Sequence, residues 1–345
     1  MLDIKAVCHK PILGFFLLLS LILTASCAHV SHEKWASSRS DLPERVMVPS
    51  VPFYPQEAYH CGPTALAMLL SWSHSDFTLQ ELVSEVYIPE RRGSLQPALL
   101  SAARRRNRLA YPIQGMNALL QELAAGHPVV VLQNLGLSWA PRWHYAVPIG
   151  YDLKKGTITL HSGNIEAKEI KWSLFMRTWG RADYWGLVVL PPNDLPASAD
   201  EKSYLKAALG LEHAGQWEGA GRAYAAALQR WPYSLGAIIG LGNSHYAMGD
   251  LIGAEQAFRN ATETHPQSGE AFNNLAHVLA DLERYAEAVE MARCAIALGG
   301  PRKSIYDQTL CEIEKSQHST PKLIRFQVQS SGFRGRNRST LVTVD

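Results

Sequence analysis

The sequence predicts a two-part fold: an α+β domain followed by an all-α array of short helices. Three observations support this. Between residues 50 and 190, apolar helical segments come first and β-branched runs come after them. A proline-rich stretch, residues 191–200, then interrupts the pattern. From residue 201 the chain is rich in alanine and repeats with a fixed period. At 345 residues, the chain is long enough for two domains with separate cores.

The N-terminus has the features of a targeting segment. Lys5 and Lys10 precede an apolar run of 12 residues, Ile12 to Leu23, which is short of the roughly 20 that a membrane-spanning helix needs. Residues 1–26 are therefore predicted to be a signal peptide. The string Leu23-Thr-Ala-Ser-Cys27 resembles a bacterial lipoprotein signal. This resemblance implies a lipid on Cys27 and, with Ala28 next, the periplasmic face of the outer membrane. The alternative is an ordinary secretory signal.

Residues 27–49 are polar and predict a tether between the membrane and the first domain. Three cysteines lie beyond it, Cys61, Cys294 and Cys311, too few for a disulfide framework, so we expect free thiols. The net charge of +2 gives no reason to expect a nucleic-acid partner. The arginine cluster at 104–108 is expected to be a solvated helix end.

A cysteine stands where a loop meets an apolar helix. Gly62 and Pro63 follow Cys61 and fit a first helical turn, because a proline there loses no needed N–H group. A thiol at a helix N-terminus is expected to ionise more readily, since the helix dipole favours the thiolate. Gln56, five residues earlier, can offer its amide to an oxyanion. The alternative is a cysteine buried in the core.

The candidate base lies 83 residues after the cysteine. His144 opens the apolar stretch that ends in Gly150-Tyr-Asp152, which predicts a strand followed by a turn. A histidine at this place can take the proton of a thiol that the fold brings next to it. Alone, His144 would more often be a structural histidine.

The combined pattern resembles a known family. The residues that carry it are Pro55-Gln56, Cys61-Gly-Pro-Thr-Ala-Leu-Ala-Met68, and His144-Tyr-Ala-Val with Gly150-Tyr-Asp152. Residues 50–190 resemble papain-like peptidase domains that cleave double-glycine leaders from bacteriocin precursors, in particular their stand-alone branch. The resemblance implies a papain-like fold, with Cys61 as the nucleophile, His144 as the base and Gln56 as the oxyanion donor.

A third group is expected to orient the base. Asp152 is too distant, because eight residues of strand span roughly 26 Å. A hairpin that pairs Tyr151 near Gly156 would bring residues 161–164 beside His144. In the family an Asp occupies this place, whereas here it is Ser162. We predict that Asn164 orients His144, with Ser162 as an equal alternative. The alternative is that a backbone carbonyl holds His144, so that Cys61 and His144 act as a dyad.

The remaining elements of the first domain follow from the apolar pattern. A helix is predicted over Leu79–Val86, because Thr78 and Glu81 form a capping box, and a second over Asn117–Ala125. Gln133 and Asn134 are expected either near His144 or in the core. The predicted strands are Pro128–Leu132, Tyr145–Tyr151, Thr157–His161 and Tyr184–Leu190.

The second domain has a period of 34 residues. Positions that recur at this spacing are Gly215 and Gly249, Ala220, Ala254 and Ala288, Ala227, Ala261 and Ala295, Tyr224 and Phe258, and Pro232 and Pro266. This is the tetratricopeptide-repeat pattern. Residues 201–316 are therefore predicted to form a solenoid of about three repeats, with a capping helix over 304–316. Residues 317–345, basic and rich in serine, are predicted to be disordered.

These residues predict a membrane-anchored cysteine peptidase of the cell envelope. The family resemblance implies that it cleaves peptides after small residues such as glycine. The partners expected are a peptide or protein substrate, a protein in the repeat groove and the membrane; no metal or other cofactor is expected. The alternatives are an inactive peptidase fold that acts as a binding scaffold, and a Cys–His acyltransferase.

Overall fold

A computed structural model describes residues 41–56 and 60–317 of the chain. The predicted signal segment, Cys27, most of the tether and nearly all of the basic tail lie outside these residues. Within the described ranges, no helix is long and apolar enough to cross a membrane.

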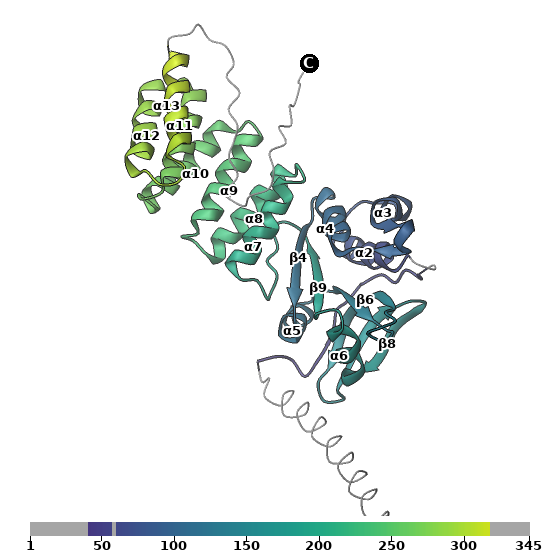
Figure 1. Ribbon diagram of the computed structural model, residues 1–345. Helices are drawn as coiled ribbons and strands as arrows, with labels where there is room; N and C mark the ends of the chain where they lie inside the picture. The colour runs from purple at the N-terminus through teal and green to yellow at the C-terminus, as the bar shows by residue number, and fades with distance from the viewer. Residues whose placement is uncertain (1–40, 57–59, 318–345) are drawn as a thin grey trace, which may run out of the picture.

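Strands and helices both occur in the first part of the chain, and only helices follow (Figure 1). The first part contains, in order, β1 (Arg45–Met47), α2 (Cys61–Trp72), α3 (Leu79–Val86), β2 (Tyr87–Ile88), a short 3-10 helix (Pro89–Arg91), β3 (Gly93–Ser94), α4 (Gln96–Arg105), β4 (Leu109–Gln114), α5 (Met116–Ala124), β5 (Val129–Asn134), β6 (Trp143–Asp152), β7 (Thr157–Ser162), β8 (Ile165–Lys171), α6 (Trp172–Gly180) and β9 (Trp185–Leu190). The second part contains α7 (Glu201–Glu212), α8 (Trp217–Arg230), α9 (Leu235–Ala247), α10 (Leu251–Thr264), α11 (Gly269–Asp281), α12 (Tyr285–Leu298) and α13 (Lys303–Gln317).

One antiparallel sheet of seven strands organises the first part. Its order is β4-β9-β5-β6-β7-β8, and β1 pairs with the far end of β6. Helices cover both faces. The face that carries Tyr145 and Val147 packs against α2, α3 and α4, whereas the face that carries Val131 and Ala146 packs against α5 and α6. The arrangement is an α+β domain.

Helix α2 is the most deeply buried element of this domain. Every side chain from Ala65 to Leu70 has no exposed surface. Each such leucine stabilises the fold by roughly 2 kcal/mol relative to an exposed one. Gly62 brings the start of the helix against its neighbours, because a Cβ there would lie 2.5 Å from Ser94. Burial along its whole length fixes the position of Cys61.

Several predicted elements are confirmed. Helix α3 has the predicted bounds, and both halves of the Thr78–Glu81 capping box are present. The predicted strands all occur, with ends displaced by one or two residues. Strands β4 and β8 and helices α4 and α6 were not predicted. Their sequences lack a clear period: β8 is mostly charged and exposed, and β4 contains Pro112, which is tolerated because β4 is an edge strand.

The hairpin of β6 and β7 differs in register from the prediction. Tyr151 pairs with Ile158 rather than near Gly156, and Asp152 pairs with Thr157. Asp152 closes the turn by accepting a 2.8 Å bond from the N–H of Lys155. An irregularity between Pro148 and Gly150 then shifts the pairing by one residue. This shift partly offsets the error, so the end of β7 still lies beside His144.

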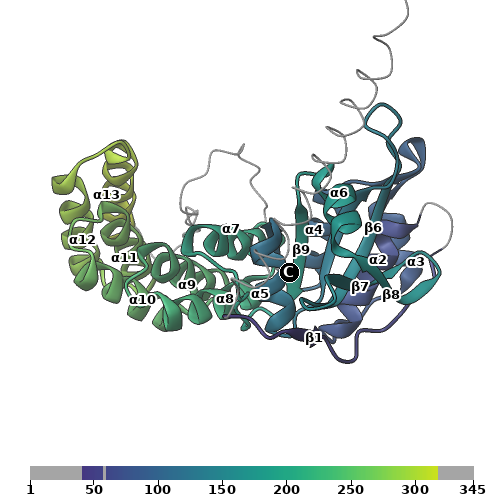
Figure 2. The same ribbon diagram turned by 90° about the horizontal axis from the view of Figure 1, so that it is seen from below.

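In the second part, consecutive helices pack against each other in a curved row (Figure 2). Gly215 and Gly249 end the connections at which the chain reverses, with φ of 72° and 78°. Glu283 occupies the equivalent place with φ 59°, although it is not a glycine. The aromatic rings of Tyr224 and Phe258 fill the space over Gly240 and Gly242. Gly215, Gly249 and Glu283 therefore recur in equivalent backbone positions, whereas Tyr224 packs on the helix after its own and Phe258 on the helix before its own.

The two parts share one core rather than a free linker. Tyr204 and Ala208 of α7 belong to the same apolar cluster as Leu109 and Leu190 of the sheet edge. The buried carboxylate of Glu122 in α5 accepts bonds from the N–H groups of Ala197 and Ser198, at 3.2 and 2.7 Å. The proline-rich segment is therefore fastened to the first part.

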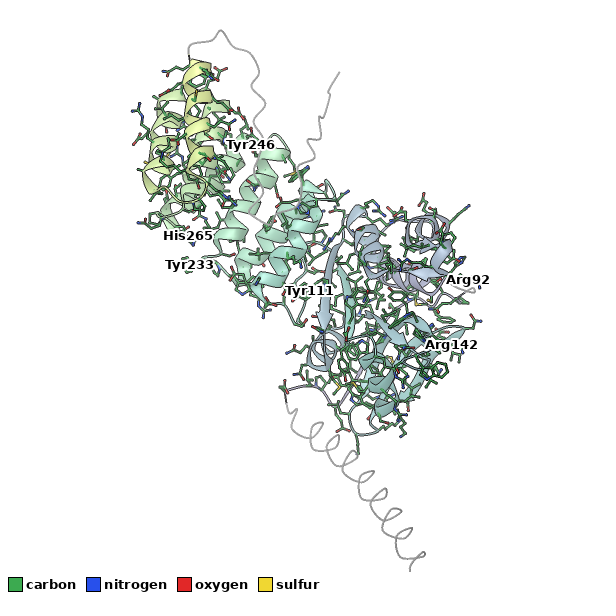
Figure 3. All side chains as sticks on the ribbon, viewed as in Figure 1. Arg92, Tyr111, Arg142, Tyr233, Tyr246 and His265 are labelled. Carbon is green, nitrogen blue, oxygen red and sulfur yellow. The ribbon has the colours of Figure 1, made fainter. Side chains whose placement is uncertain are left out.

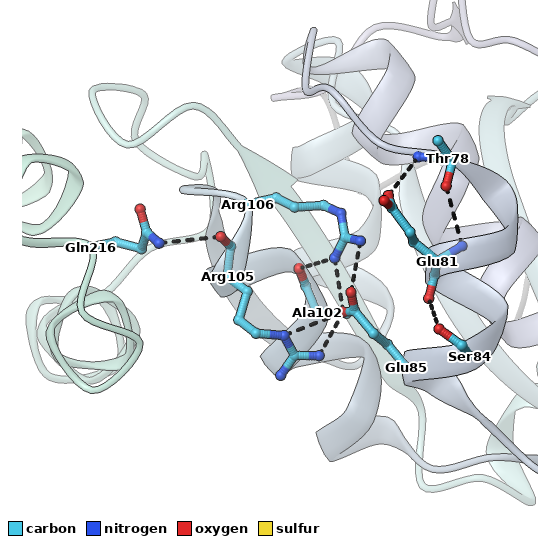
Figure 4. A network of polar contacts seen from close by, with 8 residues as sticks. All are labelled: Thr78, Glu81, Ser84, Glu85, Ala102, Arg105, Arg106 and Gln216. Atoms are coloured by element: carbon cyan, nitrogen blue, oxygen red, sulfur yellow. Dashed lines mark hydrogen bonds and ion pairs between the residues drawn. The ribbon is translucent and has the colours of Figure 1, made fainter.

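The arginine cluster after α4 is used within the protein. Arg105 and Arg106 both pair with Glu85, at 2.6 and 2.9 Å, and hold the pKa of that carboxyl at about 2 (Figure 4). The carbonyl of Arg105 accepts a bond from Gln216 of the second part. Arg108 donates to the carbonyl of Ser73. We expected this cluster to be a solvated helix end. Instead, its arginines make contacts within the protein.

Candidate active site

Cys61 is the first residue of α2, as predicted. No side chain caps the helix, so its first N–H groups remain available to the thiol or to a bound group. A backbone hydrogen bond from Tyr145, the residue after His144, reaches the sulfur. The helix start therefore places the nucleophile candidate directly against β6.

Burial controls the charge of this thiol. Desolvation raises the pKa of Cys61, and the backbone bonds of Tyr145 and Gly62 oppose the rise without cancelling it. The expectation of a ready thiolate is wrong for this state, because loss of hydration outweighs the helix terminus. The resting form is the neutral thiol.

His144 lies at the start of β6, partly buried, opposite Gln133 of β5. Burial lowers the pKa of its imidazole to about 4, and the positive charge of Lys168 on β8 acts in the same direction. A neutral imidazole is the form that can accept a proton. The effect of Lys168 on His144 was not predicted, because no strand was predicted at β8.

Ser162 is the residue that bonds His144. Its Oγ lies 2.9 Å from Nε2 of the ring. Strand geometry explains this: Val147 and His161 are paired and share a face, and His144 and Ser162, each an odd number of residues away, both lie on the opposite face. Asn164 is exposed in the turn that follows, and His144 bonds Ser162 instead.

Gln56 also meets β6. Its Nε2 donates to the carbonyl of Tyr145 at 3.3 Å, and its backbone N–H donates to Gly163 at 3.2 Å. The backbone N–H and C=O of Tyr145 therefore bond Cys61 and Gln56 rather than a strand. The site lies at the edge of β6, just beyond the end of β7, beside the residue that follows His144.

The resting geometry is open. Within the described ranges, no hydrogen bond joins the sulfur of Cys61 to the His144 ring, whose bond goes to Ser162. Catalytic hydrogen bonds are often long before substrate binds. The same ranges contain no group of three or more His, Cys, Asp or Glu side chains able to hold a metal.

The remaining candidates belong to the core. Gln133 donates a 2.7 Å bond to Thr178 of α6, and Asn134 accepts from two backbone N–H groups of the loop that follows it. His161, on the face opposite to Ser162, accepts from Ala167 and contacts Val51. These residues support the strands that carry the site.

Residues 48–184 match the model of the Peptidase C39 like family. This segment is similar to that family, and the similarity suggests a cysteine peptidase. A search of curated proteins finds no match.

Solved structures resemble each part separately. A Bacillus anthracis protein described as a C39-like peptidase is 18% identical, with a TM-score of 0.37, and covers 43% of this chain and 98% of its own. A double-glycine motif protease from an AMS/PCAT transporter, in complex with the leader peptide, is 21% identical with a TM-score of 0.32, covering 42% and 93%. The Yersinia enterocolitica chaperone SycD with a YopD peptide is 18% identical with a TM-score of 0.32, covering 34% and 93%.

Proposed function

We propose that this protein is a cysteine peptidase of the cell envelope, with Cys61 as the nucleophile and His144 as the general base. The observation that carries the proposal is the convergence at Tyr145. Its backbone bonds both the thiol of Cys61 and the amide of Gln56, and the adjacent His144 is held by Ser162 at 2.9 Å. Nucleophile, base, orienting group and oxyanion donor thus lie within a few residues of one strand edge.

The neutral forms of both groups define the first step. His144 takes the proton of Cys61 as the sulfur attacks the scissile carbonyl carbon, and the carbonyl oxygen becomes an oxyanion. The second N–H of Gln56 Nε2 and the N–H groups at the start of α2 stabilise that oxyanion. Ser162 on Nε2 leaves Nδ1 of His144 to exchange the proton with the thiol.

The same base completes the reaction. The imidazolium gives its proton to the leaving amine as the C–N bond breaks, which leaves a thioester on Cys61. Water then attacks the thioester and gives a proton to His144, releasing a carboxylate and restoring the thiol. If an amine or alcohol replaced this water, the enzyme would be an acyltransferase, and only analysis of the products distinguishes the two.

The N-terminal segment supports a place for the enzyme. We propose that Cys27 is lipidated and anchors the chain to the periplasmic face of the outer membrane. The support is the string Leu23-Thr-Ala-Ser-Cys27 after a short apolar run. Cells fed labelled palmitate should label the wild type and not Cys27→Ser. Recovery of the wild type as an unlipidated soluble protein would rule the anchor out.

The helical part is proposed to be a tetratricopeptide-repeat array that binds a peptide or protein. The support is the 34-residue period, with Gly215, Gly249 and Glu283 in the same backbone conformation. Stacked repeats of this kind form extended concave surfaces.

The direct test compares peptides released in membranes that carry the wild type, Cys61→Ala or Cys311→Ala. Cys311 is an exposed free cysteine of α13 and serves as the matched control. Fragments should appear with the wild type and with Cys311→Ala, and disappear with Cys61→Ala. Full activity of Cys61→Ala would reject the nucleophile.

A second candidate function is a binding scaffold with an inactive site. The observation that favours it is burial, which raises the pKa of Cys61 and lowers that of His144, with no bond between them. Iodoacetamide labelling separates the two functions. In a peptidase, His144→Ala should slow the labelling of Cys61 about tenfold or more, because the base no longer draws off the proton. In a scaffold, the rate should not change.

A further inference from the structure

Exposed apolar side chains gather in the loop between β5 and β6. The exposed fractions are 52% for Leu135, 51% for Leu137, 81% for Trp139 and 54% for Trp143. Single exposed apolar residues are ordinary, but a contiguous group marks an interaction surface. We call residues 135–143 the apolar hairpin. The peptidase mechanism uses none of these four side chains.

The apolar hairpin is braced rather than loose. The Leu135 N–H donates to the Arg142 carbonyl at 2.9 Å, and Leu137 and Ala140 exchange two backbone bonds at 3.1 Å. Asn134 Oδ1 accepts from the N–H groups of Gly136 and Arg142, both at 2.9 Å, and Arg181, which follows α6, donates to the Gly136 carbonyl. These contacts keep the apolar side chains turned outward, although burying them would be favourable.

The apolar hairpin projects from the end of the sheet where β6 begins, beyond the neighbouring elements (Figure 2). A projecting tip, with Trp139 four-fifths exposed, offers little concave surface to enclose a peptide side chain. A bilayer interface accepts such a tip, because tryptophan and leucine partition into it without a preformed groove. Shape therefore favours a membrane over a peptide.

Charge favours the same partner. The apolar hairpin contains one charged residue, Arg142, which is exposed at the outer edge of the domain (Figure 3). Arg177 lies on α6, and Arg181, which directly follows α6, donates to the carbonyl of Asn134, where the apolar hairpin begins. Cations that flank tryptophan and leucine are typical of surfaces that meet lipid headgroups.

The proposed lipid anchor can reach the membrane that the apolar hairpin would touch. The other end of β6, at Asp152, pairs with Arg45 near the first described residue. Nine steps along β6 span about 30 Å, whereas the 14 steps from Cys27 to Asp41 can span up to about 46 to 50 Å. The anchor and the apolar hairpin can therefore contact one bilayer together.

We propose that the apolar hairpin inserts into the interfacial region of a phospholipid bilayer and holds the active-site end of the sheet at the membrane surface. His144 directly follows Trp143, so the cleft would open within a few residues of the lipid. The substrates favoured by this placement are peptides that are themselves held at a membrane. Joint contact of the anchor and the apolar hairpin with one bilayer requires the proposed lipid at Cys27. Insertion of the apolar hairpin does not require it.

The test therefore uses the chain from Ala28 onward, which lacks the lipidated cysteine and keeps every described residue. Sedimentation with vesicles of phosphatidylcholine and phosphatidylglycerol measures its partition coefficient. The double variant Leu137→Ala/Trp139→Ala should lower this coefficient about tenfold or more, because two interfacial side chains are lost. Tyr233→Ala is the matched control: Tyr233 is 77% exposed but lies on the helical part (Figure 3), and its loss should change nothing.

A second measurement reports depth. Brominated lipids should quench the tryptophan fluorescence of the wild type more than that of Trp139→Phe, whereas the melting temperatures stay equal. Equal partition of the double variant and the wild type would overturn the proposal. So would binding that salt abolishes and that does not depend on Trp139. A raised KM for a soluble peptide with unchanged vesicle binding would assign the apolar hairpin to substrate instead.

Discussion

At the scale of single residues, the site depends on how a strand edge is left open. Tyr145 makes its outward backbone bonds with Gln56 and Cys61 because β7 ends at Ser162, before it would cover this part of β6. The last residue of β7 is therefore the one that meets His144. The roles of the side chains follow from this geometry and can be tested one at a time.

The first residue-scale prediction concerns Ser162. Ser162→Ala should lower kcat at least tenfold, about 1.4 kcal/mol, because His144 loses the bond that holds Nε2. Asn164→Ala, two residues away in an exposed turn, is the matched control and should stay within twofold. If neither change reaches tenfold, a backbone group orients His144 and the pair is a dyad.

The second concerns pH. His144 acts as a base only when neutral, and its pKa is lowered to about 4, so activity should persist on the acid side to about pH 4. An ordinary histidine would lose it near 6.5. Lys168→Met removes a positive charge that lowers this pKa and should move the acid limb to higher pH. Lys171→Met, on the same strand, should not. An acid limb at pH 6.5 in the wild type would contradict this environment.

The sequence predicts Cys61 at the start of a helix, as the structure shows, but it does not decide between Ser162 and Asn164 as the partner of His144. Cys61 is marked locally, by Gly62, Pro63 and an apolar helix. The choice between Ser162 and Asn164 depended on strand register, which the irregularity after Pro148 shifts by one residue. Register is set by packing across the sheet, and no local residue pattern encodes it.

At the scale of elements, the helical part shows how one backbone conformation is repeated with different residues. Gly215 and Gly249 adopt positive φ at no steric cost, whereas Glu283 adopts φ 59° with a side chain. The period of 34 residues predicted these three positions as equivalent, and the structure confirms that equivalence. The sequence missed β4, β8, α4 and α6, because edge strands and short amphipathic segments carry weak periodicity.

The third prediction follows from that exception. Glu283→Gly should raise the free energy of unfolding by about 0.5 to 1 kcal/mol, since relief of left-handed strain exceeds the entropy lost. Glu283 is exposed, so the gain would not come from packing. Gly249→Ala places a Cβ in the same conformation and should destabilise instead. Denaturant unfolding measures both, and a destabilised Glu283→Gly would show that its side chain has a contact worth more than the strain.

At the scale of the whole molecule, the first part and the helical part behave as one body because of their shared core. Helix α7 packs on the edge strand β4, and the Tyr204 hydroxyl donates to the Ala223 carbonyl at 3.0 Å inside the same cluster. A peptide held by the helices would therefore keep a fixed relation to the site. The composition of the sequence predicted a boundary at the proline-rich segment. It did not predict the contacts that join the two parts there.

The last prediction concerns Glu122 and tests the contacts that join the two parts. Its buried carboxylate accepts four bonds, from His127, from the N–H groups of Ala197 and Ser198, and from the Ser198 hydroxyl at 2.6 Å. Glu122→Ala should cost about 3 kcal/mol, because it leaves buried donors unpaired. Ser198→Ala removes one of the four and should cost about 1 kcal/mol.

Loss of the Glu122 contacts should affect the junction between the two parts before it affects either core, and this order distinguishes it from general destabilisation. In Glu122→Ala, hydrogen exchange should rise first over residues 191–212, since that segment loses its attachment while the cores on either side remain. Heating should then give two transitions in place of one. A uniform rise in exchange across the chain, with a single transition, would mean that Glu122 stabilises the first part alone and that α7 is held on β4 by apolar contact.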